Sequence, residues 1–299
     1  MCSACAVTGG SSGIGKCVAI EAAKLGANVT IIARDSNKLQ AATDKIKTYV
    51  IHESQRISYL SLDISRDYPF VKKCLHNLEV ELGPIYILFS CAGTAICGTV
   101  EQLSIEDANY LINLNFLGTL HVVKALIPSF KSQKEGFIAI TASQAALLGI
   151  YGYSTYCCTK FALRGLAECL HMELKPYNIS VTLALPPDTD TPGFENEEKS
   201  KPEATREISQ KGGLFKPEIV AAQIVKDVLG KKFFSTVGLD GAMLTVLCSG
   251  MSPASSILRL LYESCFMGVL RLISHYIHYD MAKIVTKHEN IEVQEKIDT

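Results

Sequence analysis

Short apolar runs alternate with longer segments of helical periodicity along the first 240 residues of the chain. The apolar runs predict strands at residues 4–8, 27–34, 56–62, 85–90, 136–143, 178–186 and 233–237. Apolar positions at helical spacing predict helices at residues 16–26, 37–50, 67–82, 104–130, 153–175 and 217–229. Strands that alternate with helices in this way indicate an α/β fold, a doubly wound parallel sheet of the Rossmann type.

This fold predicts where the functional residues meet. The carboxyl ends of parallel strands lie along one edge of the sheet, so Asp63, Gly93 and Ser143 are expected at the same edge. After the strand at 178–186, a proline-rich turn and the polar stretch 195–213 indicate a mobile lid over that edge. We therefore expect one domain at residues 1–240, with a substrate lid at 189–215.

Residues 241–299 are expected to form an amphipathic helical extension with a charged tail. Between 257 and 278, polar residues recur at near-helical spacing and leave a wide apolar face; they are Arg259, Glu263, Arg271, His275 and His278. The charges interrupt any apolar run of about 18 residues, which argues against a transmembrane span. The apolar face could lie in a membrane interface, cover a lipid tunnel, pack between subunits or pack on the core. The two histidines fit the polar stripe better than a metal site.

Composition narrows the functional classes. A chain of 299 residues with 48% hydrophobic and 20% charged residues can bury a large core. A net charge of -1, without a basic stripe, gives no indication of nucleic-acid binding. The 11 scattered cysteines, with no signal peptide before them, indicate reduced intracellular thiols. Cys2 and Cys5 form a C-x-x-C pair, but Cys5 enters a strand and no second pair completes a zinc site, so we assign no redox or metal role.

A glycine-rich turn follows the first strand directly. Residues 8–15 read TGGSSGIG and lead into the first helix. Glycines between a strand and a helix allow a tight turn and a close approach of backbone to a pyrophosphate, whose charge the helix N-terminus favours. The sequence therefore predicts a dinucleotide site here, with a plain tight turn as the alternative.

The end of the second strand bears on which dinucleotide is bound. A dinucleotide fold that prefers NAD(H) carries an acidic residue there, whereas this chain has Ala33 and then Arg34, a guanidinium suited to a 2′-phosphate. We therefore expect NADPH/NADP+, unless Arg34 is only a solvated surface charge. Asp35 fits a helix cap with Ser36 better than a ribose ligand.

The segment 143–160 carries the candidate chemistry. In a helix, Tyr156 and Lys160 are one turn apart on the same face, and the ammonium favours the phenolate over the phenol. That would let a phenol with a reference pKa of about 10 exchange a proton near neutral pH. Ser143 ends a strand and can place a second hydroxyl on the same carbonyl oxygen. Alone, such a Tyr-x-x-x-Lys pair also arises by chance on exposed helices.

Asn115 lies in the apolar context LINLNFLGTL of the predicted helix at 104–130. An amide left unpaired in a core costs about 1–3 kcal/mol, so a buried asparagine needs hydrogen-bond partners. Asn115 could serve the active site or could cap or bridge backbone groups.

Together these residues resemble the short-chain dehydrogenase/reductase family over residues 4–193. The resemblance rests on the turn at 8–15, Cys91-Ala92-Gly93, Asn115, Ser143, Tyr156-x-x-x-Lys160 and the turn at 186–191. Within the family, the segments 9–27, 152–194 and 224–230 are similar to those of the reductases that act on 3-ketosphinganine.

The resemblance implies NADPH-dependent reduction of a long-chain sphingoid-base ketone, 3-ketosphinganine, to sphinganine, at the cytosolic face of the endoplasmic reticulum membrane. Tyr156 would protonate the carbonyl oxygen, which Ser143 would hold, while Lys160 would lower the pKa of the tyrosine and bind the nicotinamide ribose. Asn115 would hold a water that links Lys160 to solvent. The family commonly dimerises through helices like those at 104 and 153, which implies a homo-oligomer.

The resemblance also implies a set of cofactor contacts. They are Gly9, Ser11, Ser12, Gly13, Ile14, Gly15, Arg34, Lys38, Asp63, Ala92, Gly93, Tyr156, Lys160, Pro186, Thr189 and Thr191.

Two positions depart from the family pattern. Ser90 stands where the family usually has asparagine, so a supporting hydrogen bond is expected to differ. The 3-ketosphinganine reductases carry a hydrophobic segment before the first strand, whereas this chain starts almost at that strand, so we expect the anchor to be missing and membrane contact to involve the terminal helix. Two other functions stay open: a reductase of a steroid, retinoid or prostanoid carbonyl, and a catalytically impaired dinucleotide-binding protein.

Overall fold

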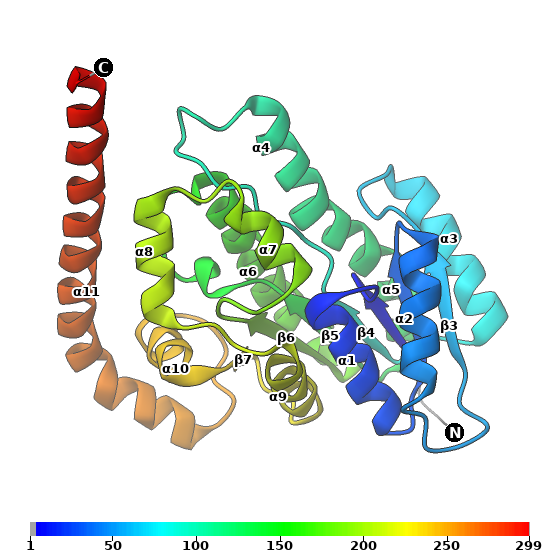
Figure 1. The fold of residues 1–299 in the computed structure, drawn as a ribbon. Coiled ribbons are helices and arrows are strands. Elements are labelled where there is room, and N and C mark those ends of the chain that lie inside the picture. Colours follow the sequence, from blue (N-terminus) through cyan, green and yellow to red (C-terminus); the bar gives the residue numbers. More distant parts are fainter. Residues whose placement is uncertain (1–3, 299) are drawn as a thin grey trace.

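A seven-stranded, all-parallel sheet forms the centre of the molecule (Figure 1). The computed structural model describes residues 4–298, with side chains up to residue 291. The strands are β1 (Ala4–Thr8), β2 (Asn28–Ala33), β3 (Ile57–Ser61), β4 (Ile87–Ser90), β5 (Gly136–Thr141), β6 (Ile179–Leu185) and β7 (Phe234–Thr236). Their order in the sheet is β3-β2-β1-β4-β5-β6-β7, which confirms the predicted doubly wound fold.

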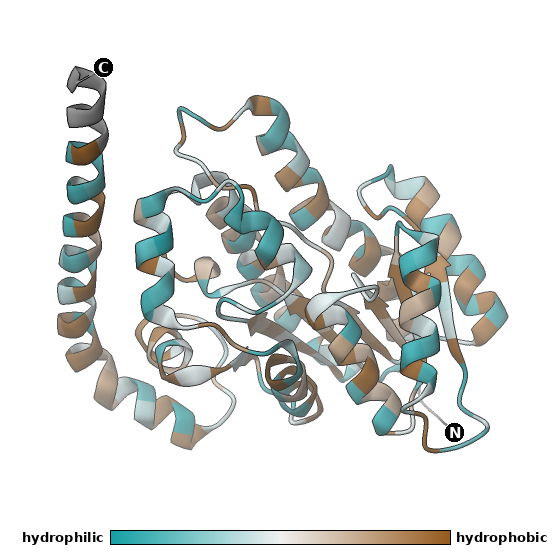
Figure 2. Cartoon of the chain, in the orientation of Figure 1, coloured by the Kyte–Doolittle hydropathy of each residue, from teal (hydrophilic) through white to brown (hydrophobic). Residues whose placement is uncertain are grey.

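Helices cover both faces of the sheet (Figure 1). One face packs against α1 (Gly13–Lys24), α2 (Ser36–Lys47) and α9 (Pro217–Leu229). The other packs against α3 (Tyr68–Leu82), α5 (Thr119–Gln133) and α6 (Ser154–Leu174). Successive strand residues serve opposite faces: Leu88 belongs to the core under α3, α5 and α6, and Phe89 to the core under α1, α2 and α9. Because both faces are covered, the strands are apolar on both sides, as Figure 2 shows.

Side-chain caps set the start of several helices. Asp35 accepts hydrogen bonds from the backbone N–H groups of Asn37 and Lys38 and begins α2, which confirms its predicted role as a cap. Asp67 caps α3 in the same way through the N–H of Phe70. These caps hold the helices that follow β2 and β3 at the sheet edge where the cofactor is expected.

The helix expected at 104–130 has a different geometry from the prediction. It begins as α4 (Ile105–Leu111), widens into a π-helical segment η1 (Ile112–Gly118) and continues as α5. Insertion of a π-helical turn leaves little trace in apolar spacing, so the sequence predicted a continuous α-helix. Among the described residues this is the one stretch long and apolar enough to cross a membrane, but 44% of its most apolar window is buried, and α5 packs on α3 in the core.

The expected lid segment consists of two short helices and is closed at its base. It contains α7 (Pro192–Glu198) and α8 (Glu203–Gly212). The N–H of Phe215 donates to the carbonyl of Asp188, and the N–H of Asp190 donates to the carbonyl of Phe215, both at 2.9 Å. The two ends of the predicted lid at 189–215 therefore lie side by side, and the segment between them covers the carboxyl ends of the strands.

The C-terminal extension contains α10 (Gly238–Leu247) and the 42-residue α11 (Ile257–Asp298), so the expected boundary at residue 240 falls inside α10. The first half of α11 runs past α10 and its second half runs beside α8 (Figure 1). Ile284 packs against Ala204 and Ile208 of the lid. Lys287 and His288 contact Glu207 at 3.0 and 2.9 Å.

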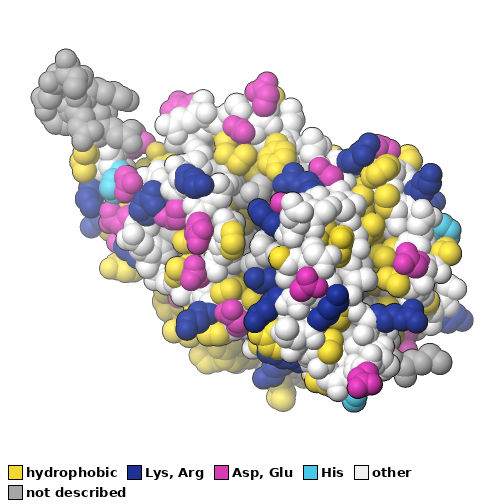
Figure 3. Space-filling view, turned by 45° about the vertical axis from the view of Figure 1, so that its right-hand side comes forward, with side chains coloured by type: hydrophobic (Ala, Val, Ile, Leu, Met, Phe, Trp, Pro, Cys, Tyr) yellow, Lys and Arg dark blue, Asp and Glu magenta, His cyan; other side chains and the backbone are white. Residues whose placement is uncertain are grey.

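The apolar face of α11 does not pack on the core. Leu258, Leu272 and Tyr276 are 79%, 75% and 70% exposed, whereas Glu263 is 7% exposed and paired with Arg259. Four uses of this face were considered in the sequence analysis. In the part of the chain that the structure describes, the exposed side chains exclude one of them, packing on the core. Elsewhere the charges are mixed: the face in Figure 3 carries Lys and Arg side chains interspersed with Asp and Glu.

The C-x-x-C pair of the sequence consists of Cys2 and Cys5. Cys2 lies outside the described residues. Cys5 is buried inside β1, and burial raises the pKa of its thiol well above the usual range, which suits a core residue and not a metal ligand or redox thiol.

Candidate active site

A cleft of about 400 Å³ lies along the carboxyl ends of β1 to β6, under the lid. Every cofactor residue expected from the sequence lines it: Gly9, Ser11, Ser12, Gly13, Ile14, Gly15, Arg34, Lys38, Asp63, Ala92, Gly93, Tyr156, Lys160, Pro186, Thr189 and Thr191. Ser143 lines it as well. Asn115 is fully buried beneath the cleft and does not line it.

The glycine-rich turn leaves room only for backbone. Gly9 has a φ of +66°, and a Cβ there would lie 2.9 Å from the backbone of Ala92. A Cβ at Gly15 would lie 2.4 Å from the carbonyl oxygen of Gly9. These contacts hold β1, the loop after β4 and the start of α1 close together where they line the cleft.

The start of α1 suits an anion. Ser12 precedes α1 and its side chain makes no capping hydrogen bond, so the first N–H groups of the helix stay open to a partner in the cleft. Gly13 has a φ of +52°, and a Cβ there would lie 3.1 Å from the side chain of Thr191 across the cleft. Thr191 caps α7 through the N–H of Phe194, so the lid begins opposite this turn. The residues present therefore fit the diphosphate of a dinucleotide.

The residues expected at the adenosine end lie together at the far side of the cleft. Arg34 and Lys38 follow β2, and Asp63 follows β3. The Arg34 guanidinium donates to the hydroxyl of Tyr110 on α4 at 3.4 Å. The Asp63 carboxylate accepts hydrogen bonds from the N–H and hydroxyl of Ser65, which fixes the loop that follows β3.

Tyr156 and Ser143 meet at the other end of the cleft. Burial, together with the negative charge of Glu197, raises the pKa of the Tyr156 phenol well above its usual value, and a hydrogen bond with Ser143 opposes this. Ser143 is held at the end of β5 because its hydroxyl also accepts from the N–H of Ala145. The phenol is consequently protonated at neutral pH, the state that a proton donor requires.

Lys160 lies one turn along α6 from Tyr156. Its ammonium is 5.4 Å from the centre of the Tyr156 ring and donates to the carbonyl of Thr141 at 3.3 Å. Burial lowers the pKa of Lys160 to about 8. An ammonium carries three donors, and the described residues accept from one of them, so the others stay available to hydroxyl groups or water in the cleft. Burial and Glu197 raise the pKa of Tyr156, and the lowering of that pKa by Lys160 stays a prediction.

Asn115 has its partners within the protein. Its carbonyl oxygen accepts from the N–H of Thr94 at 2.9 Å. Its amide donates to the carbonyl of Thr94 at 2.9 Å and to the hydroxyl of Thr159 at 3.1 Å. The side chain therefore bridges the loop after β4 to α6, beside Lys160, which is the backbone-bridging alternative of the sequence analysis. The role of Asn115 in holding a water stays a prediction.

Ser90 makes hydrogen bonds of its own in the asparagine position. It is 1% exposed, lies 3.5 Å from the hydroxyl of Thr8 and donates to the hydroxyl of Thr119 at 3.4 Å. Thr8 in turn accepts from the N–H groups of Cys91 and Ala92 at 3.1 and 3.2 Å. The loop that carries Gly93 is thus tied to β1 by Thr8, with Ser90 at its side.

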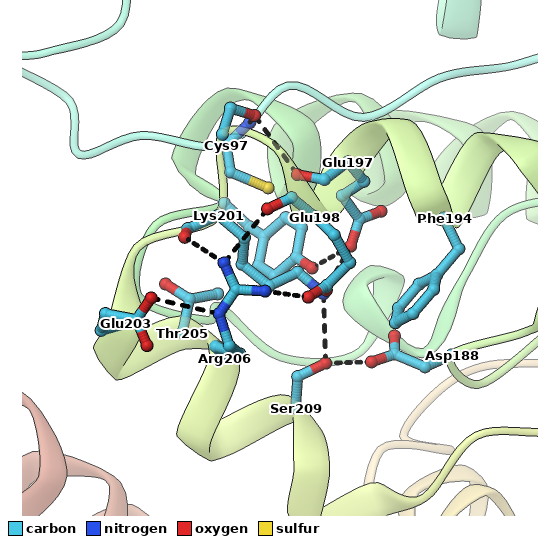
Figure 4. A network of polar contacts seen from close by, with 12 residues as sticks. Cys97, Asp188, Phe194, Glu197, Glu198, Lys201, Glu203, Thr205, Arg206 and Ser209 are labelled. Carbon is cyan, nitrogen blue, oxygen red and sulfur yellow. Dashed lines mark hydrogen bonds and ion pairs between the residues drawn. The ribbon is translucent and has the colours of Figure 1, made fainter.

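A network of charges within the lid was not predicted from the sequence (Figure 4). Lys201, whose side chain is fully buried, pairs with Glu197 at 2.9 Å and with Glu198. Arg206 pairs with Glu198 and Glu203, and Ser209 bonds Asp188. Glu197 also accepts a hydrogen bond from Tyr153, whose ring centre is 5.5 Å from that of Tyr156.

Two of these carboxylates, Glu197 and Asp188, line the cleft together with Phe194. One feature of the sequence could have indicated this network: acidic and basic residues recur three to four positions apart at 197–206. These residues belong to the polar stretch that predicted a mobile lid. Only the structure shows that Lys201 points inward.

The comparisons with known proteins decide the family. The family model described as short chain dehydrogenase matches residues 3–202. The chain belongs to the short-chain dehydrogenase family. This membership confirms the resemblance seen in the sequence, and members of the family use NAD(H) or NADP(H).

Relatives that match most of the chain are named 3-ketodihydrosphingosine reductase or 3-dehydrosphinganine reductase. The chain is 45% identical over 268 residues to the 3-ketodihydrosphingosine reductase of Bos taurus, covering 90% of this chain and 81% of the relative. It is 44% identical over 268 residues, with the same coverage, to the 3-dehydrosphinganine reductase of Danio rerio. A 3-dehydrosphinganine reductase of Arabidopsis thaliana is 36% identical over 284 residues, covering 94% and 85% of the two chains.

Solved structures agree with the fold. Levodione reductase superposes with a TM-score of 0.72 at 21% identity, covering 81% of this chain and 98% of that one. A short-chain dehydrogenase from Sphingobium yanoikuyae, in complex with NADPH, superposes with a TM-score of 0.72 at 24% identity, covering 83% and 93%.

Proposed function

We propose that the protein reduces 3-ketosphinganine to sphinganine with NADPH as the hydride donor. The observation that carries this proposal is the pairing of a complete Ser143-Tyr156-Lys160 arrangement in the cleft with relatives at 44–45% identity that are named for this reaction. Because these relatives match this chain over 90% of its length, the similarity includes the lid as well as the sheet.

The side chains divide the chemistry of carbonyl reduction among them. A reduced nicotinamide, when bound, supplies a hydride to the carbonyl carbon. The Tyr156 phenol donates its proton to the carbonyl oxygen as negative charge develops there, and the Ser143 hydroxyl holds the same oxygen. Lys160, whose ammonium is 5.4 Å from the ring centre, stabilises the phenolate that Tyr156 becomes. Carbonyl, hydride and proton together give the alcohol, so the reaction balances without a metal.

The preference for NADPH over NADH rests on charge at the end of β2. Arg34 and Lys38 both line the adenosine end of the cleft, where a 2′-phosphate adds negative charge that NADH lacks. Asp35 and Asp63 also line this end of the cleft, and the Asp35 carboxylate is held by the N–H groups of Asn37 and Lys38, which it caps.

The protein's site of action is proposed to be a membrane surface, the cytosolic face of the endoplasmic reticulum. The exposed apolar side chains of α11 support membrane contact, since a contiguous apolar face on a soluble domain marks an interaction site; they include Ile257, Leu258, Leu261, Val269, Leu272, Tyr276 and Tyr279. The assignment to the endoplasmic reticulum follows from the resemblance alone. Contact between two copies of the chain is the competing use of this face.

Vesicle flotation distinguishes these uses of α11. The triple variant Leu258→Asp, Leu272→Asp and Tyr276→Asp should stay with the soluble fraction when mixed with phosphatidylcholine vesicles, while the wild type floats. Val80→Asp, at an equally exposed apolar position on α3, serves as the control and should float like the wild type. A wild type that stays soluble but elutes as a dimer, broken by the triple variant, would assign the face to self-association.

The reaction itself is tested by NADPH oxidation with purified protein in detergent. The substrates are 3-ketosphinganine, a steroid ketone and a blank without ketone. We expect turnover of the long-chain base and none above the blank with the steroid. Turnover of the steroid alone would assign the protein to another carbonyl, and the absence of both turnover and NADPH binding would indicate a catalytically impaired protein.

A further inference from the structure

The lid side of the cleft is acidic. The carboxylates of Glu197 and Asp188 line it, whereas the cations among the described lining residues are Arg34 and Lys38 at the adenosine end and Lys160 at the catalytic tyrosine. Within the lid network, Asp188, Glu197, Glu198 and Glu203 face two cations, Lys201 and Arg206. Neither lid cation lines the cleft, so a positive group on a bound molecule would find uncompensated negative charge there.

Glu197 is fixed in place and keeps one oxygen for the cleft. Its Oε1 accepts from the Tyr153 hydroxyl and from the Lys201 ammonium at 2.9 Å. Its Oε2 has no partner among the residues that the structure describes, and Figure 4 shows this oxygen pointing away from the network. A carboxylate that is oriented by two donors through one oxygen presents the other with little loss of side-chain entropy.

The same carboxylate lies close to the reacting group. Tyr153, which bonds Glu197, stacks at a tilt on Tyr156 with 5.5 Å between ring centres. The negative charge of Glu197 is also one of the causes that raise the pKa of Tyr156. Glu197 is therefore linked to Tyr156 through one intervening side chain, that of Tyr153, and Glu197 and Tyr156 line the same cleft.

The substrate of the proposed function carries a matching group. In 3-ketosphinganine the carbon next to the ketone bears an amine, which is an ammonium in its protonated form. We propose that Glu197 binds this ammonium through Oε2 and so selects α-aminoketones over simple ketones. This inference rests on the proposed function for the identity of the substrate. Glu197 acts as a specificity-determining residue, distinct from the proton-donating set.

The competing explanation is that Glu197 only anchors Lys201 and Tyr153 inside the lid. Glu198 offers a matched control, because it pairs with both Lys201 and Arg206 but does not line the cleft. Glu197→Gln and Glu198→Gln both remove one charge from the network. Only the first removes a charge from the cleft.

The experiment measures kcat/KM of the wild type and both variants on two soluble eight-carbon ketones, 2-amino-1-hydroxyoctan-3-one and 1-hydroxyoctan-3-one. Loss of a charge-assisted hydrogen bond predicts that Glu197→Gln lowers kcat/KM for the aminoketone by about 10-fold to 100-fold. For the ketone without the amine, we expect Glu197→Gln to change kcat/KM by less than about threefold. Glu198→Gln should change the two substrates by the same factor. Equal losses on both substrates with Glu197→Gln, or a selective loss with Glu198→Gln, would overturn the inference.

A binding measurement separates this inference from the proposed function. With NADP+ present, eight-carbon sphinganine should raise the Tm of the wild type, and Glu197→Gln should lose most of that shift. If the amine stabilises the wild type through Glu197 but no aminoketone is reduced, the proposed function fails and the amine site stands. Equal shifts in wild type and Glu197→Gln, or none in the wild type, contradict the amine site whatever the turnover.

Discussion

The Lys160 ammonium lies 5.4 Å from the centre of the Tyr156 ring and donates to the carbonyl of Thr141 at 3.3 Å. The lysine is 5% exposed, and burial lowers its pKa to about 8. A charge held in this position favours the phenolate of Tyr156, yet it also costs folding free energy because an ammonium is removed from water. Activity and stability should therefore respond in opposite directions when the charge is removed.

Lys160→Met tests the effect of this buried charge on stability. The unfolded chain binds the lysine proton up to its ordinary pKa of 10.5 and the folded chain only up to about 8, so wild-type stability rises between these pH values. At pH 7 the variant should be more stable by about 3 kcal/mol, and at pH 10.5 the gain should nearly vanish. Urea unfolding without cofactor measures both, with Lys73→Met on exposed α3 as the control. A destabilised variant at pH 7, or a gain that does not depend on pH, would contradict the account.

Tyr156→Phe should separate chemistry from cofactor binding. Removal of the proton donor is expected to lower kcat by about 10²-fold to 10⁴-fold. The thermal stabilisation by NADPH should persist, because the phenylalanine ring fills the same space. Tyr177→Phe, just beyond the end of α6, is the control and should keep wild-type turnover. Substantial remaining activity in Tyr156→Phe would assign proton donation to another group.

Arg34→Ala should change the choice of cofactor. Arg34 lines the cleft after β2, and loss of its charge-assisted contact should raise Kd for NADPH by about 10-fold to 100-fold while NADH changes little. Titration of both cofactors by fluorescence measures this, with Arg56→Ala before β3 as a surface control. If the two cofactors weaken by the same factor, Arg34 does not read the 2′-phosphate.

Lys201→Met should loosen the lid. The fully buried ammonium pairs with Glu197 and Glu198, and its removal takes this partner from two partly buried carboxylates, at a cost of about 3 kcal/mol. Hydrogen exchange of residues 192–212 should then speed up, with strands β1 to β6 unchanged. Lys199→Met, exposed on the same segment, should exchange like the wild type. Unchanged protection in Lys201→Met would mean that packing alone holds the lid.

Much of the fold follows from the sequence because local signals and tertiary structure agree. The apolar strands, the glycine-rich turn before α1 and the cap at Asp35 each have a short-range cause, and all three are found where expected. The cleft residues were also expected together, since parallel strands bring Asp63, Gly93 and Ser143 to one edge.

The remainder depends on contacts that residue spacing does not encode. The π-helical segment around Asn115 changes the hydrogen-bond register without a change in composition. Lys201 belongs to a polar stretch, and only the closure of residues 188 and 215 turns it inward. For α11, periodicity showed an apolar face but not its direction, and the contacts of α8 with Ile284 and His288 leave that face outward.

The most direct test of the central claim is the transfer of a label from cofactor to lipid. NADPH deuterated at nicotinamide C4 on the transferred face is mixed with the protein and 3-ketosphinganine in detergent, and the product is analysed by mass spectrometry. We expect sphinganine with one deuterium, located at C3, and labelled product formed about 10²-fold to 10⁴-fold more slowly with Tyr156→Phe. The absence of sphinganine, or sphinganine without the label from either face of the cofactor, would contradict it.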